Sequence, residues 1–347
     1  MTAAIRTPLE LPAAWIGRDV SQRSDWIHRL TPAEIAEIDA ALAQARSTAR
    51  PMAELSRADF PLPQLGHAIA RWMGELDRGR GFVLVRGLPV QRWSEADAAL
   101  AYWGLGLHMG SPVSQNAAGD LLGHVRDTGA DPKNPAVRLY KTRVDLGFHC
   151  DGSDVVGLLC LKPAKSGGVS RIVSSISVYN EILRRRPDLA PLLFEPFYWD
   201  RNEEQRPGEA PFFALPIAFD QAGRLRIFYI GWYIRGAQRH ADVPRLSPQQ
   251  RELLDLIDGI AAMPEFHLDM EFEAGDIQLL KNSVILHART EYEDFPEPER
   301  KRHLLRLWLT AHSGFADGDA FLQQGIPKKE GVDSDAGGLS RGREARA

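Results

Sequence analysis

Three residues of the chain have the types and the spacing that a metal ion would need. His149 and Asp151 are separated by one residue in the segment FHCDG. On an extended segment, residues i and i+2 project to the same face, so both side chains could reach one ion. The pair alone is a weak signal, because ten histidines and 46 acidic residues among 347 give about one such pair by chance. His287, which ends the apolar run 283–287, supplies a third ligand of the same kind.

An expected strand near the C-terminus carries two arginines on one face. In the segment RHLLRLW, Arg302 and Arg306 are four residues apart, and a period of two puts them on the same side. Apolar residues on both sides of this strand indicate that both of its faces are buried. Buried guanidinium groups are costly unless they meet anions, so the pair predicts an anionic ligand. The alternative is two solvent-facing arginines on an edge strand.

Two histidines and one carboxylate on one side of a metal leave three coordination positions open, as in non-heme Fe(II) oxygenases. Imidazole and carboxylate ligands suit Fe(II), whereas thiolates would suit zinc or iron–sulfur centres. The open positions can take a chelating cosubstrate and O2, and an inward arginine can pair with a carboxylate at the far end of that cosubstrate.

Four segments taken together resemble the TauD/TfdA (taurine dioxygenase-like) family of Fe(II)- and 2-oxoglutarate-dependent oxygenases. They are FHCDGSD, SGGVSRIVSS, GDIQLLKNSVILHART and RKRHLLRLWL, and the resemblance extends over about 81–311. Each segment alone is weak, and their combination and order carry the likeness. The resemblance implies a double-stranded β-helix, a cupin-like jelly roll of mainly β or α+β class with flanking helices.

The resemblance also implies roles for individual residues. Fe(II) would have three protein ligands, namely His149, Asp151 and His287. Arg302 and Ser170 would hold the distal carboxylate of the cosubstrate 2-oxoglutarate, and O2 would be the oxidant. Arg306 matches a second arginine nearer the iron, which contacts either the carboxylate next to the keto group or an anionic substrate.

The chain departs from the family pattern in two places. The loop from His287 to Arg302 is a few residues longer than in the shortest members, and the residue pair before Ser170 lacks the usual acid. Neither departure changes the ligand set. Asp151 is present where related halogenases have Gly or Ala, so halogenation is disfavoured.

Three further segments could contact the substrate. A charged pair precedes the first ligand, an amide pair lies in a loop that borders the substrate in the family, and an aromatic pair lies in YIGWYIR. The alternatives are a surface salt bridge, plain turn chemistry and core packing, respectively. The candidate residues are Arg143, Asp145, Gln115, Asn116, Tyr229 and Trp232.

Four further histidines, and the cysteine next to the first ligand, are interpreted as structural. Strand parity points His303 away from Arg302, and Cys150 alternates away from the metal and is expected to be a packed thiol. The other histidines in this group are His108, His124 and His240.

Composition excludes several other classes of protein. The formal net charge is −4, so a nucleic-acid binder, which needs basic excess, is not expected. Two cysteines cannot build a disulfide framework or a Cys-rich zinc site. No apolar run approaches the length of a membrane span, and no secretory signal is recognisable, so a cytoplasmic protein without a membrane partner is expected.

Apolar periodicity predicts the elements that position these residues. Helices are expected over 31–46, 64–76, 94–103, 177–185 and 247–262, the first opened by a capping box at Thr31. Strands are expected over 81–86, 155–161, 170–174, 226–230, 266–272, 277–280, 283–287 and 304–310.

These elements suggest one dioxygenase domain over 31–312. Residues 1–30 are predicted to be an N-terminal extension anchored by Trp15 and Trp26, and residues 313–347, which lose apolar periodicity, a flexible tail. The polar segment 200–212 is interpreted as a solvated loop or, alternatively, as a lid over the site.

The sequence thus predicts an Fe(II)- and 2-oxoglutarate-dependent dioxygenase that hydroxylates a small organic, amino-acid-like or acidic substrate. The resemblance implies that 2-oxoglutarate is decarboxylated to succinate and CO2. The same cofactor could instead give desaturation, epoxidation or cyclisation in a natural-product pathway. The alternative from another class is a non-catalytic cupin-like binding protein. A homo-oligomer, either a dimer or a tetramer, is left open.

Overall fold

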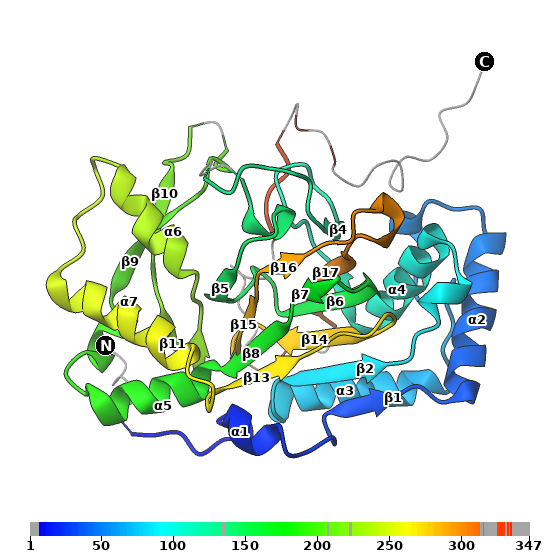
Figure 1. The fold of residues 1–347 in the computed structure, drawn as a ribbon, viewed down its shortest axis with the longest axis horizontal. Coiled ribbons are helices and arrows are strands. Elements are labelled where there is room, and N and C mark those ends of the chain that lie inside the picture. Colours follow the sequence, from blue (N-terminus) through cyan, green and yellow to red (C-terminus); the bar gives the residue numbers. More distant parts are fainter. Residues whose placement is uncertain are drawn as a thin grey trace.

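Two β-sheets with helices packed outside them form the body of the molecule (Figure 1). The structure is a computed structural model that describes residues 7–133, 137–206, 208–221, 224–312, 315, 325–329, 332 and 334. In this part of the chain, no helix combines the length and the apolar character needed to cross a membrane.

The large sheet has seven strands in the order β1-β2-β14-β6-β17-β3, with β4 also paired to β17. All neighbours are antiparallel except β1 and β2. Its strands are β1 (Ile27–Arg29), β2 (Phe82–Arg86), β3 (Gly110–Pro112), β4 (Leu122–Val125), β6 (Val155–Lys162), β14 (Ile277–Lys281) and β17 (His303–Ala311).

The small sheet holds two of the three predicted metal ligands. Its strand order is β13-β8-β15-β5, and all pairs are antiparallel. In the ladders, His287 is paired with His149, and Arg289 is paired with Ser170. The strands are β5 (Leu146–His149), β8 (Ser170–Ser174), β13 (His267–Met270) and β15 (Ile285–Arg289).

Alternation along β17 divides the core into two apolar layers. Leu305, Leu307 and Leu309 pack with the helices that cover the outer face of the large sheet, whereas Trp308 belongs to the cluster that includes the inner residues of the small sheet. The outer layer is covered by three helices, which are α2 (Pro32–Ser47), α3 (Leu65–Arg78) and α4 (Glu95–Met109). Arg306 and Trp308, which both contact Asp151, share the inner face, as strand parity predicts, and Arg302 immediately precedes the strand.

Further helices and short hairpins complete the fold around the small sheet. Figure 1 shows α5 and α7 at the end of the molecule opposite α2. These elements are α1 (Gly17–Val20), α5 (Ser175–Arg185), α6 (Gly231–Gly236) and α7 (Pro248–Ala261), with strands β7 (Ser166–Gly167), β9 (Pro196–Asp200), β10 (Phe212–Pro216), β11 (Ala218–Gln221), β12 (Arg224–Ile227) and β16 (Tyr292–Glu293).

Most predicted elements are present, and the capping box at Thr31 is formed. Two predicted strands are displaced. The strand predicted over 283–287 lies at Ile285–Arg289, because Asn282 and Ser283 form the turn from β14. The strand predicted over 226–230 ends at Ile227, because the Tyr229 backbone pairs with Cys150 instead of continuing the ladder. The helix predicted over 94–103 continues to Met109.

Both terminal segments contact the body of the fold. The carbonyl oxygens of Ala13 and Trp15 accept hydrogen bonds from two serines of the β8–α5 region, Ser174 and Ser177, and both donating hydroxyls are buried. Trp15 is itself buried. Near the other end, the amides of Ile326 and Lys329 donate to the carbonyls of Ser114 and Ala117 at 2.8 and 2.7 Å. The tail predicted over 313–347 falls mostly outside the described residues.

Candidate metal centre and active site

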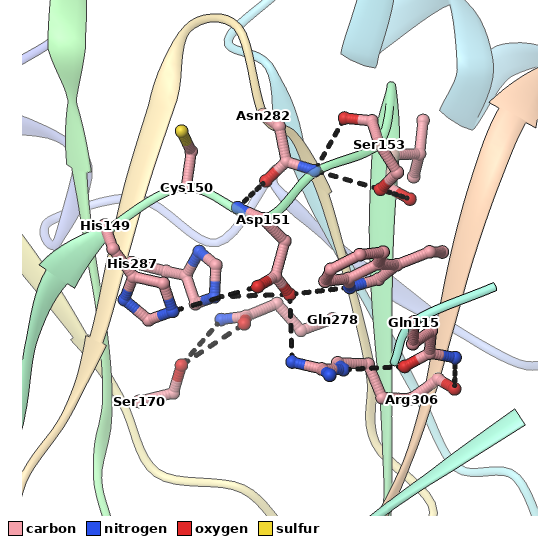
Figure 2. Close-up of polar contacts among 12 residues, drawn as sticks. Gln115, His149, Cys150, Asp151, Ser153, Ser170, Gln278, Asn282, His287 and Arg306 are labelled. Atoms are coloured by element: carbon pink, nitrogen blue, oxygen red, sulfur yellow. Dashed lines mark hydrogen bonds and ion pairs between the residues drawn. The ribbon is translucent and has the colours of Figure 1, made fainter. Parts of the chain in front are cut away.

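His149, Asp151 and His287 meet on the inner side of the small sheet (Figure 2). One potential ligand atom from each residue lies within 4.8 Å of the others, and all three residues are buried. The Nε2 atoms of His149 and His287 are each 3.9 Å from a carboxylate oxygen of Asp151. The three residues predicted to bind a metal therefore lie together and form one compact set of donor atoms.

Local backbone contacts orient the first histidine and the aspartate. His149 ends β5, and its Nδ1 lies 2.9 Å from the carbonyl oxygen of Gly147. Since a carbonyl only accepts, Nδ1 carries the proton and the lone pair of Nε2 faces Asp151. The side-chain Oδ1 of Asn282 accepts the backbone N–H of Asp151 at 3.0 Å. The turn between β14 and β15 thus fixes the segment that follows the first ligand.

The protonation states of the three side chains suit a cation. Burial lowers the pKa of His149, and burial together with His149 lowers the pKa of His287 to about 3. Burial opposes ionisation of Asp151, but Arg306 and the two histidines outweigh it and lower its pKa to about 2. At neutral pH the site therefore offers two neutral imidazoles and one carboxylate, which are the forms that bind a metal ion.

Arg306 and Trp308 hold the carboxylate of Asp151 from the large sheet. Nη1 of Arg306 is 3.2 Å and Nε1 of Trp308 is 2.8 Å from Oδ2 of Asp151. Nε of Arg306 donates to Oε1 of Gln115 at 2.8 Å, and the Gln115 amide donates to the carbonyl of Arg306 itself. Gln115 is thus brought to the site, although it contacts Arg306 and is not exposed there.

Ser170 lies on β8 with its hydroxyl beside Gln278 of β14, a residue that the sequence interpretation did not single out. Nε2 of Gln278 lies 3.0 Å from Oγ of Ser170, and both side chains are buried. The hydroxyl of Ser170 in turn donates to Oε1 of Gln278 at 3.2 Å. Arg302 is also buried, and burial lowers its pKa.

Arg289 and Tyr292 are two further residues that sequence reasoning missed. The guanidinium carbons of Arg289 and Arg302 lie 4.8 and 5.0 Å from the centre of the Tyr292 ring. Burial, with the nearby Arg302, lowers the pKa of Arg289 to about 10. The position of Arg289 two residues after His287, on the same face of a strand, was the signal that could have identified it.

Aromatic rings border the metal ligands on another side. The Trp232 ring lies 4.9 Å from the His149 ring, as expected for a residue near the site. The guanidinium of Arg306 lies 4.7 Å from the centre of the Tyr140 ring. Next to these rings, Arg138 forms a two-bond ion pair with Glu204, with Nε to Oε1 at 2.8 Å. Glu204 belongs to the segment 200–212, so this loop is joined to the segment that precedes the metal ligands.

Three of the six proposed substrate residues have partners elsewhere, and a fourth is exposed. Arg143 is exposed and pairs with Asp127 at 3.0 Å. Arg143 also lines a cavity of about 680 Å³ that lies beside Tyr292. Asp145 is exposed, and Asn116 bonds within its own loop to Asp120 at 2.9 Å.

Tyr229 is the clearest departure from the substrate prediction. Its hydroxyl donates to Asp258 of α7 at 2.7 Å, and its ring is fully buried in the core. Trp232 follows only three residues later but lies beyond the end of β12, in α6, where the chain has changed direction. The aromatic pair is therefore divided between the core and the metal site.

The histidines interpreted as structural have protein partners. His303 lies on the outer face of β17, where its Nε2 is 2.8 Å from Nδ1 of His124 and its Nδ1 is 3.6 Å from Glu95. His108 contacts the carbonyl of Phe60 at 2.7 Å. Burial raises the pKa of the Cys150 thiol to about 12, consistent with a packed, unreactive side chain.

A two-sheet β-helix with an inward His-Asp-His set and inward arginines on the last strand defines a non-heme iron oxygenase that uses 2-oxoglutarate. The profile of the taurine catabolism dioxygenase TauD, TfdA family matches residues 47–308. The chain belongs to this family, and it is a 2-oxoglutarate-dependent dioxygenase with Fe(II) as its metal and O2 as its second cosubstrate.

Two characterised relatives are similar over nearly the whole chain. FR-33289 synthase of Streptomyces rubellomurinus is 31% identical over 321 residues, which are 90% of this chain and 94% of the relative. The taurine hydroxylase-like protein SAT17 of Stachybotrys chartarum is 31% identical over 304 residues, which are 85% and 77% of the two chains. Both alignments are longer than the stretch 47–308 that the family profile matches.

Solved structures share the fold at low sequence identity. Asparagine oxygenase in complex with Fe(II), 2S,3S-3-hydroxyasparagine and succinate superposes with a TM-score of 0.64 and 15% identity, covering 82% of this chain and 93% of that one. The non-heme iron oxygenase OrfP in complex with Fe and alpha-ketoglutaric acid gives a TM-score of 0.60 at 16% identity, covering 82% and 94%. The jelly-roll fold predicted from the sequence is confirmed.

Proposed function

We propose that His149, Asp151 and His287 are the iron ligands of this dioxygenase. The observation that carries this assignment is the buried donor set, in which two imidazoles are held neutral and the carboxylate is held ionised. The orphaned Nδ1 of His287 has no hydrogen-bond partner among the described residues, so that ring is free to adjust to a metal. With iron bound, such a site supplies the oxidative decarboxylation of 2-oxoglutarate that drives substrate oxidation.

We further propose that Arg302 and Ser170 hold the distal carboxylate of 2-oxoglutarate. Nη1 of Arg302 is buried and has no hydrogen-bond partner among the described residues. The Ser170 hydroxyl donates to Oε1 of Gln278 at 3.2 Å and would turn from it to a bound carboxylate, while Nε2 of Gln278 still donates to the Ser170 oxygen. Arg306 is not assigned this role, because its Nη1 and Nε are already engaged by Asp151 and Gln115.

For the substrate we propose a small, polar molecule that carries an anionic group and is amino-acid-like. The residues that border the metal ligands combine aromatic rings, Trp232 and Tyr140, with the guanidinium of Arg306. Nη2 of Arg306 makes no hydrogen bond within the described part of the chain, and it can meet a substrate anion. The names of the relatives and the hydroxylated amino acids bound in the solved structures support hydroxylation as the outcome.

The other outcomes of the same chemistry, which are desaturation, epoxidation and cyclisation, place the same demands on these residues. A non-catalytic metal- or ligand-binding protein could share this donor set, but the chain belongs to a family of dioxygenases. The cytoplasmic location, the oligomeric state and the lid role of 200–212 stay predictions.

An anaerobic absorption titration tests the proposal. Fe(II) is added to the protein, followed by 2-oxoglutarate, and a weak visible charge-transfer band is expected only when both are present. Small zwitterions and organic anions that carry carboxylate or sulfonate groups are then screened for a shift of this band and for succinate formation in air. A folded protein that binds iron but gives no band with 2-oxoglutarate would contradict the assignment of the cosubstrate site.

A further inference from the structure

Two arginines approach the same aromatic ring inside the fold, and only one of them has a role so far. Arg289 and Arg302 are 6% and 4% exposed, and their guanidinium carbons lie 4.8 and 5.0 Å from the centre of the Tyr292 ring. Tyr292 forms β16 on the loop between β15 and β17, so it lies between the ends of the two strands that carry the arginines.

Within the residues that the structure describes, neither guanidinium has a carboxylate in direct contact, although Asp145 acts on Arg289 and Asp294 on Arg302 from farther away. Nη2 of Arg289 donates to the carbonyl of Val144, but its Nε and Nη1 have no hydrogen-bond partner, and neither has Nη1 of Arg302. Two buried cations that act on each other and retain donors without acceptors favour an anion at this place.

The register of the small sheet shows which way Arg289 points. In the antiparallel ladder of β15 and β8, Arg289 is directly paired with Ser170, and paired residues project from the same face. Arg289 is also two residues beyond His287 on β15, which again gives the same face. Arg289 therefore lies on the face that carries both a metal ligand and the proposed cosubstrate hydroxyl.

We propose that Arg289 is a second binding residue for the distal carboxylate of 2-oxoglutarate, opposite Arg302, with the Tyr292 ring as the surface that holds both guanidinium groups. This inference rests on the proposed cosubstrate site and adds to it a source of selectivity. Two guanidinium groups favour a cosubstrate with a distal carboxylate over a 2-oxo acid that ends in a methyl group.

A purely structural role for Arg289 makes a different prediction. Its bond to the Val144 carbonyl joins the segment before β5 to β15, and loss of this bond would weaken the fold or the whole metal site. Such damage would affect every 2-oxo acid equally, because all of them chelate iron through the same keto acid group. The ratio of two affinities therefore separates the two roles.

The experiment measures dissociation constants anaerobically on the Fe(II)-loaded protein, for 2-oxoglutarate and for 2-oxopentanoate, which replaces the distal carboxylate by a methyl group. In Arg289→Gln the preference for 2-oxoglutarate is expected to fall about tenfold or more, and Arg289→Lys is expected to recover part of it. Arg171→Gln is the matched control, because Arg171 lies next to Ser170 on β8, faces the other way and pairs with Asp269 at 3.0 Å. The control should leave the preference unchanged.

An unchanged preference in Arg289→Gln, with the melting temperature of the native protein, would overturn the inference. If that variant does not fold, Arg289→Lys decides, because it keeps the charge but loses the planar fork. An undiminished preference in Arg289→Lys would then overturn the inference, and a fall of about threefold or more would support it. Failure of the unaltered protein to bind 2-oxoglutarate at all would instead refute the proposed cosubstrate site.

Discussion

Arg306 of β17 contacts Asp151, in the segment between β5 and β6, with Nη1 of the arginine 3.2 Å from Oδ2 of the carboxylate. Trp308 donates to the same oxygen, while Oδ1 accepts no hydrogen bond within the described residues. The protein thus occupies one oxygen of the carboxylate and presents the other to a metal. Asp151 would hold a metal through a carboxylate that Arg306 keeps ionised.

Removal of the arginine should weaken metal binding. Arg306→Met leaves Asp151 buried with Trp308 as its remaining side-chain donor, so the carboxylate is less readily ionised. A fall of about 10–100-fold in Fe(II) affinity is expected, as for other residues that orient metal ligands. Equilibrium metal titration under anaerobic conditions measures this, with Arg171→Gln as the control. Native affinity in Arg306→Met would show that the contact does not tune the ligand.

Loss of a ligand should abolish turnover but leave the fold intact. His149→Ala and Asp151→Ala are expected to eliminate succinate formation coupled to substrate, since each removes one of three protein ligands. His108→Gln, which alters a histidine on α4 far from the small sheet, should retain activity. Circular dichroism checks folding. Normal turnover in either ligand variant would mean that the metal is held elsewhere.

Truncation of Arg302 should act mainly on 2-oxoglutarate. Arg302→Ala removes a buried guanidinium that has an unpaired donor, and a loss of about 2–3 kcal/mol of binding free energy is expected. That corresponds to a rise of roughly 30–150-fold in the 2-oxoglutarate concentration needed for half-maximal rate. The substrate concentration for half-maximal rate should change little. The opposite division of effects would assign Arg302 to the substrate.

The ion pair between Arg138 and Glu204 should restrain the segment 200–212. In Glu204→Gln the peptide bond after Arg201 is expected to become more accessible to trypsin, by about five- to tenfold in rate, since a partly buried ion pair contributes about 1 kcal/mol. Glu209→Gln, whose nearest contact with Arg201 is at 3.9 Å, is the control. Equal cleavage of the two variants would argue against a closing role for the ion pair.

Stability should depend on pH through His124. Burial, with the adjacent His303, lowers the pKa of His124 from 6.5 to about 4 in the folded protein. Between these values the unfolded chain binds more protons, so stability is lost as the pH falls from 6.5 towards 4. Urea unfolding at pH 7 and pH 5 should show a fall of about 1–2 kcal/mol, after allowance for solvent screening, that is reduced in His124→Gln. Arg126, Glu95 and Asp120 also act on this ring and are unchanged in the variant. The same fall in both proteins would exclude His124 as its source.

The sequence was sufficient to predict the parts of the site that follow from strand parity. Arg302 and Arg306 on one face of β17, His303 on the other, and His149 with Asp151 across one residue are all local patterns. The order of motifs then added His287 and the fold. No three-dimensional information was needed for these predictions.

Other side chains near the site, such as Arg138 and Glu204, could not be predicted, because loops distant in sequence bring them together. Glu204 and Arg138 are 66 residues apart and meet only through the β9–β10 hairpin. Tyr229 shows the converse, since an aromatic residue in a promising segment is directed to α7 where its hydroxyl has a partner. Such contacts depend on the direction that the chain takes after a strand, and the periodicity of apolar residues does not predict this direction.

β17 and the residue before it set a fixed distance between two arginine side chains. Arg302, immediately before β17, and Arg306 are four residues apart, and extended backbone advances about 3.3 Å per residue, so the backbone sets a spacing of about 13 Å between the proposed cosubstrate residue and the residue that contacts Asp151. Insertions in the acidic loop before Arg302 would leave the distance between Arg302 and Arg306 unchanged. A single residue inserted between them would turn one of the two outward and uncouple cosubstrate binding from metal binding in one step.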